Sequence, residues 1–309
     1  MGARRVDSTG GAAVKGRLST VARKRLLRFV TLYPKALVDD ETTVVHNIRV
    51  ASRRLQQVLQ ILLPRGKSSR SKKVFRTLRK VRRAFGRCRN LDVNLELVRG
   101  RIETTTASTR QAWERVHLWL EEKRALAVAA GRAELRKHEL VDFIERLQSL
   151  LDNAADDQEG LAQLAERTKE TLSDWRDAFE SARADPVVGR IHAFRIAGKR
   201  LRYRAELLGE AGNVPVKPMI SALKSLQDDL GLWHDHAVLR DHVAEFIGQP
   251  GFMAEEPGMC RALLLEMERD KQRDRATIEE IMTKAEKLAQ NSIQLESKAP
   301  SEAETQKSQ

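Results

Sequence analysis

Two short basic motifs recur in the sequence, and each places an imidazole beside cationic side chains. The first begins at His46 as HNIRVASRRL, and the second begins at His192 as HAFRIAGKRL, an offset of 146 residues. On a helix, His46, Arg49 and Arg53 fall within an arc of about 60°. Guanidinium groups aligned along one helix edge are suited to hold an anion, because each presents a planar fork of N–H donors.

Each motif must be positioned by an amphipathic helix. In the segment from Val45 to Leu62, the apolar residues Ile48, Leu55 and Leu59 fall on the side opposite the basic edge. This helix is therefore expected to bury one face and to present its cations on the other. The recurrence of the whole pattern predicts an internal duplication of the chain.

The charge distribution strengthens the case for an anionic partner. The net charge is +13, and residues 1–150 hold 34 basic and 14 acidic residues, whereas residues 151–309 hold 22 and 29. Between Thr42 and Leu91 there are 15 basic residues and no acidic one. A solvated helix face normally interleaves the two signs, so a single-sign cluster favours an anion that neutralises it over a generically basic surface.

Composition predicts an all-α protein with a dense charged surface. The chain has 309 residues, of which 41% are hydrophobic, 32% charged and 5% aromatic.

The cysteines and the lack of long apolar runs bear on location. The two cysteines, Cys88 and Cys260, form no C-x-x-C pair, so no disulfide framework is expected and a cytoplasmic location is favoured. No apolar run approaches the ~20 residues of a membrane span, and the first residues lack the apolar centre of a secretory signal.

Helix periodicity and breaks predict two four-helix bundles packed together. The first helix is expected from Leu18 to near Pro34, and a long helical region with an interruption at Gly131 is expected before the middle of the chain. The predicted division is a disordered N-terminus at 1–17, a first half at 18–151, a linker at 152–160, a second half at 161–290 and a disordered tail at 291–309.

The helices that follow the two motifs are duplicated as well. LRKVRRAFGRCRNLDV from Leu78 aligns with LKSLQDDLGLWHDHAV from Leu223 through Gly86 and Gly231. With both histidine motifs and the KRLRY and LQDDLG segments, residues 18 to 290 resemble the CHAD family, the conserved histidine α-helical domain. The resemblance implies two bundles related by a pseudo-two-fold axis, with a basic surface between them that binds inorganic polyphosphate. Asn90 stands where the family often has Asp, so any ion pair made by that Asp is missing.

Polyphosphate carries charge and no bases, so its affinity must come from charge neutralisation and charge-assisted hydrogen bonds. The first-rank candidate ligands are Arg49, Arg53, Arg54, Arg82, Arg83, Arg195, Lys199, Arg200 and Arg202. The second rank comprises Arg79, Lys80, Arg89, Lys224, His46 and His192. The two histidines either donate to phosphate or hydrogen-bond within the bundle and orient a neighbouring arginine. Tyr203 is expected to pack with its hydroxyl at the rim.

Nucleic acid is the main alternative ligand, since its phosphate backbone suits the same guanidinium groups. The sparse aromatic residues offer few stacking platforms, and no zinc-finger, basic-zipper or RNA-recognition signature is present. Weak, non-specific and salt-sensitive nucleic-acid binding is still expected.

A metal-dependent phosphohydrolase is the second alternative. It would rest on a cluster of carboxylates and imidazoles, namely Asp228, Asp229, His234, Asp235, His236, Asp241 and His242. On a helix, His234 and His236 lie about 200° apart and cannot bind one ion together. His234 and Asp235 are instead expected beside the basic track. The interpretation is therefore a non-catalytic protein with no catalytic residue, no metal site and no cofactor.

A scaffolding role lies close to the favoured interpretation. Such a protein could associate with polyphosphate granules in the cytoplasm and recruit protein partners to them. The acidic second half would then be a docking face for those partners. The sequence does not separate binding from recruitment.

Overall fold

The computed structural model describes residues 17–63, 68–154, 157–212 and 214–297, and these residues form helices and no strand. The predicted all-α class is confirmed. The helices are α2 (Arg17–Val38), α3 (Thr42–Leu62), α4 (Ser69–Ala84), α5 (Gly86–Thr104), α6 (Ala107–Arg136), α7 (Leu140–Asp152), α8 (Asp157–Ala184), α9 (Val188–Gly212), α10 (Lys217–Ile247), α11 (Phe252–Glu255) and α12 (Pro257–Ser297). Among them, no helix has the length and apolar character that a membrane crossing requires.

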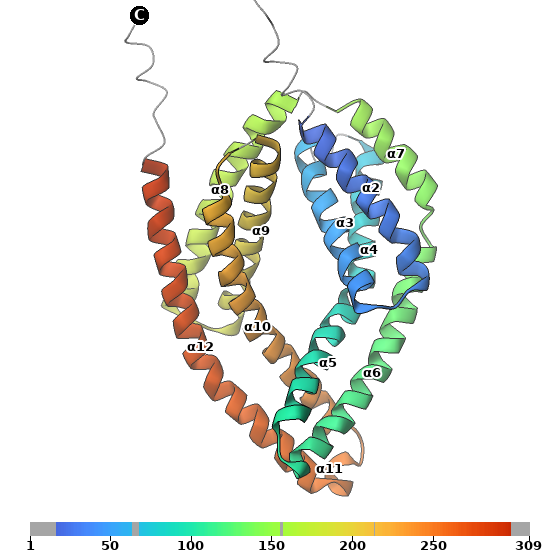
Figure 1. Ribbon diagram of the computed structural model, residues 1–309, viewed down its shortest axis with the longest axis vertical. Helices are drawn as coiled ribbons and strands as arrows, with labels where there is room; N and C mark the ends of the chain where they lie inside the picture. The colour runs from blue at the N-terminus through green and yellow to red at the C-terminus, as the bar shows by residue number, and fades with distance from the viewer. Residues whose placement is uncertain (1–16, 64–67, 155–156, 213, 298–309) are drawn as a thin grey trace, which may run out of the picture.

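The helices form two arms that converge at one end, and α2 and α3 of one arm also contact α8 and α9 of the other (Figure 1). One arm contains α2, α3, α4 and α7, and the other contains α8, α9 and the adjoining parts of α10 and α12 (Figure 1). At the converging end, α5 and α6 meet α11 and the remaining parts of α10 and α12. The two motif helices, α3 and α9, each come second in their arm.

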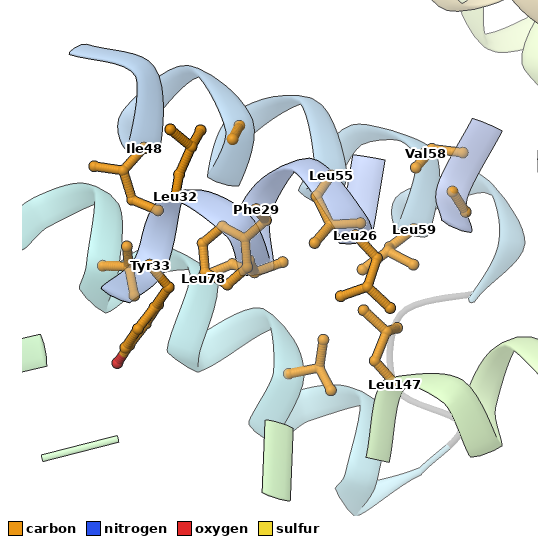
Figure 2. Close-up of a cluster of buried hydrophobic side chains, with 14 of the residues drawn as sticks. Leu26, Phe29, Leu32, Tyr33, Ile48, Leu55, Val58, Leu59, Leu78 and Leu147 are labelled. Carbon is orange, nitrogen blue, oxygen red and sulfur yellow. The ribbon is translucent and has the colours of Figure 1, made fainter. Parts of the chain in front are cut away.

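The first hydrophobic core fills the first arm and extends to Leu164 of α8 and to Leu207 and Ala211 of α9. Phe29 and Tyr33 of α2 pack against Ile48 and Leu55 of α3, and Leu78 of α4 belongs to the same cluster (Figure 2). The ring of Phe29 lies edge-on to that of Tyr33, with 5.8 Å between the centroids. The apolar stripe of α3 is thereby buried, which leaves its basic edge to face the other arm.

The second arm and the converging end each contain a core of their own. The second core is built around Trp175, Phe179 and Phe194. The third core joins both halves of the chain, because Trp113 of α6 and Phe246 of α10 belong to the same cluster. The division into two bundles with a boundary at 152–160 stays a prediction, since the cores do not divide at that boundary.

The first helix is longer than the sequence predicts. α2 continues through Pro34 to Val38. Pro34 lies on the exposed side of the helix, where water can hydrate the carbonyl that has no N–H partner, and Ala36 beyond it is fully buried. The predicted stop at Pro34 is therefore wrong.

The predicted interruption at Gly131 is also wrong, because α6 runs through this residue to Arg136. A Cβ at Gly131 would lie 2.9 Å from the ring of Phe85, so glycine here permits a close approach between helices. The helix ends instead near Leu135, whose carbonyl accepts a hydrogen bond of 2.7 Å from the hydroxyl of Tyr33. The same carbonyl also accepts the backbone N–H of His138 at 3.0 Å, so the Tyr33 hydroxyl adds a second donor at the end of α6.

The ends of the chain fall mostly outside the described residues. The predicted disordered segments, 1–17 and 291–309, overlap the described structure at Arg17, where α2 begins, and at residues 291–297, which belong to α12.

Candidate functional site

A cavity of about 720 Å³ lies between the two arms and is lined from both halves of the chain. The motif helices α3 and α9 supply most of its wall, and α4, α5, α8 and α10 complete it. Its polar lining comprises Arg49, Arg53, Gln56, Gln57, Gln60, Arg82, Asn90, Arg167, Thr171, Asp174, Arg195, Lys199, Arg200, Tyr203, Arg204 and His234.

We name five of these side chains the cavity cations: Arg49, Arg53, Arg82, Arg195 and Lys199. All five are partly buried. Burial and the charges of Arg53, Arg89 and Arg82 lower the pKa of Arg49 to about 10. Burial and the charges of Arg195 and Arg53 lower the pKa of Lys199 to about 8. The cavity cations therefore repel one another in the free protein.

Two further cavity cations, Arg82 and Arg195, also have lowered pKa values. Burial is the main reason that the pKa values of Arg82 and Arg195 lie below the ordinary arginine value, and the charge of Arg53 contributes to both. Arg53 acts on all four of the others, so it lies at the electrostatic centre of the cluster.

Neutral acceptors hold several of these guanidinium groups in place. Arg53 donates to the hydroxyl of Tyr203 at 2.6 Å, a bond that joins α3 to α9. The guanidinium of Arg53 also lies 5.4 Å from the centre of the Tyr203 ring. Arg82 donates to the side-chain oxygen of Gln56 at 2.6 Å. These contacts fix the direction of the cations without neutralising them.

The break between α4 and α5 positions a further cavity cation. Arg49 donates to the carbonyl of Phe85 at 2.8 Å, at the point where α4 ends. The next residue is Gly86, where a Cβ would lie 3.3 Å from the same guanidinium nitrogen. Glycine leaves room for the guanidinium of Arg49. The end of α4 at Phe85 therefore fixes the position of this side chain.

The cavity cations lack carboxylate partners. Within the described part of the chain, none of the five makes an ion pair within 4 Å. The Nε of Arg195 is buried and has no hydrogen-bond partner among these residues. The one carboxylate of the cavity wall, Asp174, acts on Arg204, which is not a cavity cation. The charge of Asp235, which lies outside the cavity lining, partly offsets the lowering of the pKa values of Arg195 and Lys199 without forming an ion pair with either. Partly buried, unpaired cations destabilise the free protein, and an anion that pairs with them would remove this cost.

Three other predicted ligands are already paired with carboxylates. Arg54 lies 3.7 Å from Glu206, and Arg202 donates to the same carboxylate at 2.7 Å. Lys80 lies 3.6 Å from Glu134. The structure thus places Arg54, Lys80 and Arg202 outside the unpaired cluster. Arg200, another predicted ligand, is exposed at the cavity wall.

The remaining predicted ligands lie outside the cavity lining. Arg79, Arg83 and Lys224 are exposed on α4 and α10. Arg89, on α5, is partly buried and lines a separate pocket that also contains Asp92 and Asp235. A ligand larger than the cavity would have to reach beyond it to contact any of the four.

The two motif histidines are exposed and do not line the cavity. Partial burial and the charges of Arg89 and Arg49 lower the pKa of His46. The ring of His192 stacks on that of His234, with centroids 5.6 Å apart, and His234 does line the cavity. Partial burial and the charge of His234 lower the pKa of His192, so in both motif histidines the neutral form is favoured in the free protein.

Several cavity residues were not among the predicted ligands. Gln56 and Gln60 follow Arg53 by three and seven residues on the same helix edge, so the spacing that identified the arginines could also have identified them. Arg167 and Thr171 come from α8, which carries no motif, and only the packing of the two arms brings them to the wall.

The side chains that suggested a metal site do not gather at one point in the structure, although His234 and Asp235 lie 3.3 Å apart between Nδ1 and Oδ1. His234 lies at the cavity, whereas His242 contacts Asn94 and Asp229 pairs with Lys284 at 2.7 Å. Among the described residues, no group of three or more His, Cys, Asp or Glu side chains is arranged to hold a metal ion.

The chain matches one family model, and the solved structures that resemble it include the following two. The family model described as the CHAD domain matches residues 20–244. The CHAD domain from the plant Ricinus communis has 16% identity and a TM-score of 0.63, and the match covers 86% of this chain and 91% of that one. PptA from Streptomyces chartreusis has 15% identity and a TM-score of 0.62, with coverage of 88% and 99%. No curated protein sequence matches the chain.

Proposed function

This chain belongs to the CHAD domain family, and from that premise we propose that it binds inorganic polyphosphate in the cavity between its arms without catalysing a reaction. The observation that carries the proposal is the cluster of five cavity cations, which have no carboxylate partner within 4 Å in the described structure. Their charges repel one another in a partly buried space. The phosphates of a linear polyanion would pair with these cations and neutralise the charges that repel one another.

The donor types in the cavity suit a chain of phosphates. The guanidinium groups offer paired N–H donors, and the nearby glutamine amides offer neutral donors for further oxygens. Because both arms contribute cations, one bound chain would contact α3 and α9 at the same time. Binding of this kind requires charge neutralisation alone, so no nucleophile, general base or metal is needed.

Charge reversal at the centre of the cluster tests the proposal. Arg53→Glu combined with Lys199→Glu should abolish binding of long-chain polyphosphate in calorimetric titration, because it places two carboxylates among Arg49, Arg82 and Arg195. The matched control is Lys169→Glu with Lys271→Glu, which changes the net charge equally at exposed positions and should bind within about twofold of the unaltered protein.

Circular dichroism of both variants establishes that the helices are intact. Retained tight binding in the cavity variant would overturn the site, as would an equal loss in the control. Duplex DNA serves as the competing polyanion. If DNA and polyphosphate bind equally and both lose affinity together as salt rises, the ligand is a generic phosphate backbone and the proposal is wrong.

We also propose that polyphosphate binding places the protein on polyphosphate granules in the cytoplasm, where it could recruit protein partners. A fluorescent fusion should colocalise with granules, and the Arg53→Glu/Lys199→Glu variant should be diffuse. Granule association that persists in this variant would show that another surface is responsible.

A further inference from the structure

A second set of unpaired cations lies outside the cavity, along the solvent-facing side of α4. We call Lys72, Arg76, Arg79 and Arg83 the outer row. The spacing of four, three and four residues puts them within about 60° of arc on one helix face. All four side chains are exposed, and within the described chain none has a carboxylate within 4 Å. Only Arg79 and Arg83 were predicted as ligands.

The outer row is electrostatically continuous with the cavity. Arg82 lies at the cavity wall, and the charges of Arg53, Arg83 and Arg79 all lower its pKa, after burial. Arg82 is therefore close to the centre of the cavity cluster on one side and to the outer row on the other. At a rise of 1.5 Å per residue, the row extends the field of positive charge by about 16 Å along α4.

The second half of the chain lacks a corresponding row. In the alignment of α4 with α10 through Gly86 and Gly231, the four positions are occupied by Lys217, Ser221, Lys224 and Asp228. A serine and an aspartate replace two arginines, so the row on α10 has a net charge of +1, whereas that on α4 has +4. The two halves therefore differ in charge along these exposed positions of α4 and α10.

We propose that the outer row is an exit track for polyphosphate chains longer than the cavity can hold, so that a long chain leaves over α4 and not over α10. The inference rests on the proposed function and adds a direction and a preference for long chains. A short chain neutralises the cavity cations alone. A long chain also binds the outer row, and each phosphate that the row neutralises releases counterions.

The test compares a short and a long ligand in the same variants. Lys72→Gln with Arg76→Gln removes two charges of the outer row that lie outside the cavity lining. Calorimetric titration should show tripolyphosphate binding within about twofold of the unaltered protein. Long-chain polyphosphate should bind about three- to tenfold more weakly. The slope of log K against log salt should decrease in magnitude by about 0.7 for each phosphate that the variant no longer neutralises.

The control removes two exposed charges from the second half. Lys217 is the counterpart of Lys72, and Lys271 lies exposed on α12. Lys217→Gln with Lys271→Gln should leave long-chain affinity and its salt slope unchanged. An equal loss of affinity in this control would mean that overall charge matters and not a track, which would overturn the inference.

Two other results would also overturn it. The first is unchanged long-chain affinity in the outer-row variant. The second is a loss of duplex DNA binding in that variant without a loss of long-chain polyphosphate binding, which would assign the row to nucleic acid. Failure of the unaltered protein to bind either polyphosphate would instead reject the proposed function, so the two failures are distinguishable.

Discussion

Lys199 is the residue at which ligand binding and proton binding are most directly linked. In the free protein its pKa is about 8, because of burial and the charges of Arg195 and Arg53. A polyphosphate beside it favours the ammonium form and raises that pKa. Near and above pH 8, binding should therefore take up protons, and affinity should fall as the pH rises further.

Calorimetry near pH 8 in buffers of different protonation enthalpy measures this proton uptake directly. Lys199→Met should remove the uptake and weaken binding, while the unaltered protein shows it in every buffer pair. Binding that takes up no proton, or equal uptake in the methionine variant, would show that Lys199 does not contact the ligand.

Residue types and spacing predicted the basic edges but not the full wall of the cavity. Arg49, Arg53, Arg195 and Lys199 lie on two helix edges that periodicity identifies, and all four line the cavity. Arg202 has the same residue type and directly follows the second motif, yet it pairs with a carboxylate on its own helix. The sequence contains no local signal for that difference, because which cations stay unpaired depends on how the arms pack.

The close packing of α6 against the junction of α4 and α5 affects the site through the carbonyl of Phe85, to which Arg49 donates. A Cβ at Gly131 would lie 2.9 Å from the Phe85 ring and 3.1 Å from the carbonyl of Ala84. Gly131→Ala should therefore destabilise the protein by about 1–3 kcal/mol through overpacking, despite the higher helix propensity of alanine. Because Arg49 donates to the carbonyl of Phe85, the same substitution should weaken polyphosphate binding.

Gly100→Ala is the matched control in the neighbouring helix. Nothing lies within 4 Å of a Cβ at Gly100, so alanine there should raise the free energy of unfolding by up to about 1 kcal/mol. Denaturant unfolding of the two variants tests the contrast. A stabilising Gly131→Ala would show that Phe85 moves aside at little cost.

Sequence patterns predicted the helices better than their ends. The apolar stripes identify each buried face, because burial and helix period act within a single element. The ends depend on distant partners: α6 ends where the hydroxyl of Tyr33, about a hundred residues earlier in the chain, reaches the carbonyl of Leu135. Gly131 and Pro34 are helix-breaking types, but packing keeps both inside helices.

At the scale of the whole molecule, both arms contribute cations to one cavity, so charge repulsion acts across the contact between the two halves of the chain. Arg53 on α3 repels Arg195 and Lys199 on α9, while its hydrogen bond to Tyr203 and the shared third core hold the halves together. Screening this repulsion should stabilise the free protein. The same screening should weaken polyphosphate binding, because salt competes with counterion release.

Stability and affinity should therefore respond to sodium chloride in opposite directions. The Tm of the free protein should rise with salt, and polyphosphate affinity should fall over the same range. In Arg53→Gln the rise in Tm should be smaller, because the central charge of the cluster is gone. With polyphosphate bound, Tm should be higher than in the free protein at low salt, since the ligand binds only the folded state. If Arg53→Gln shows the same salt dependence of Tm as the unaltered protein, the repulsion between the arms is too weak to matter, and the surface charges determine the salt response.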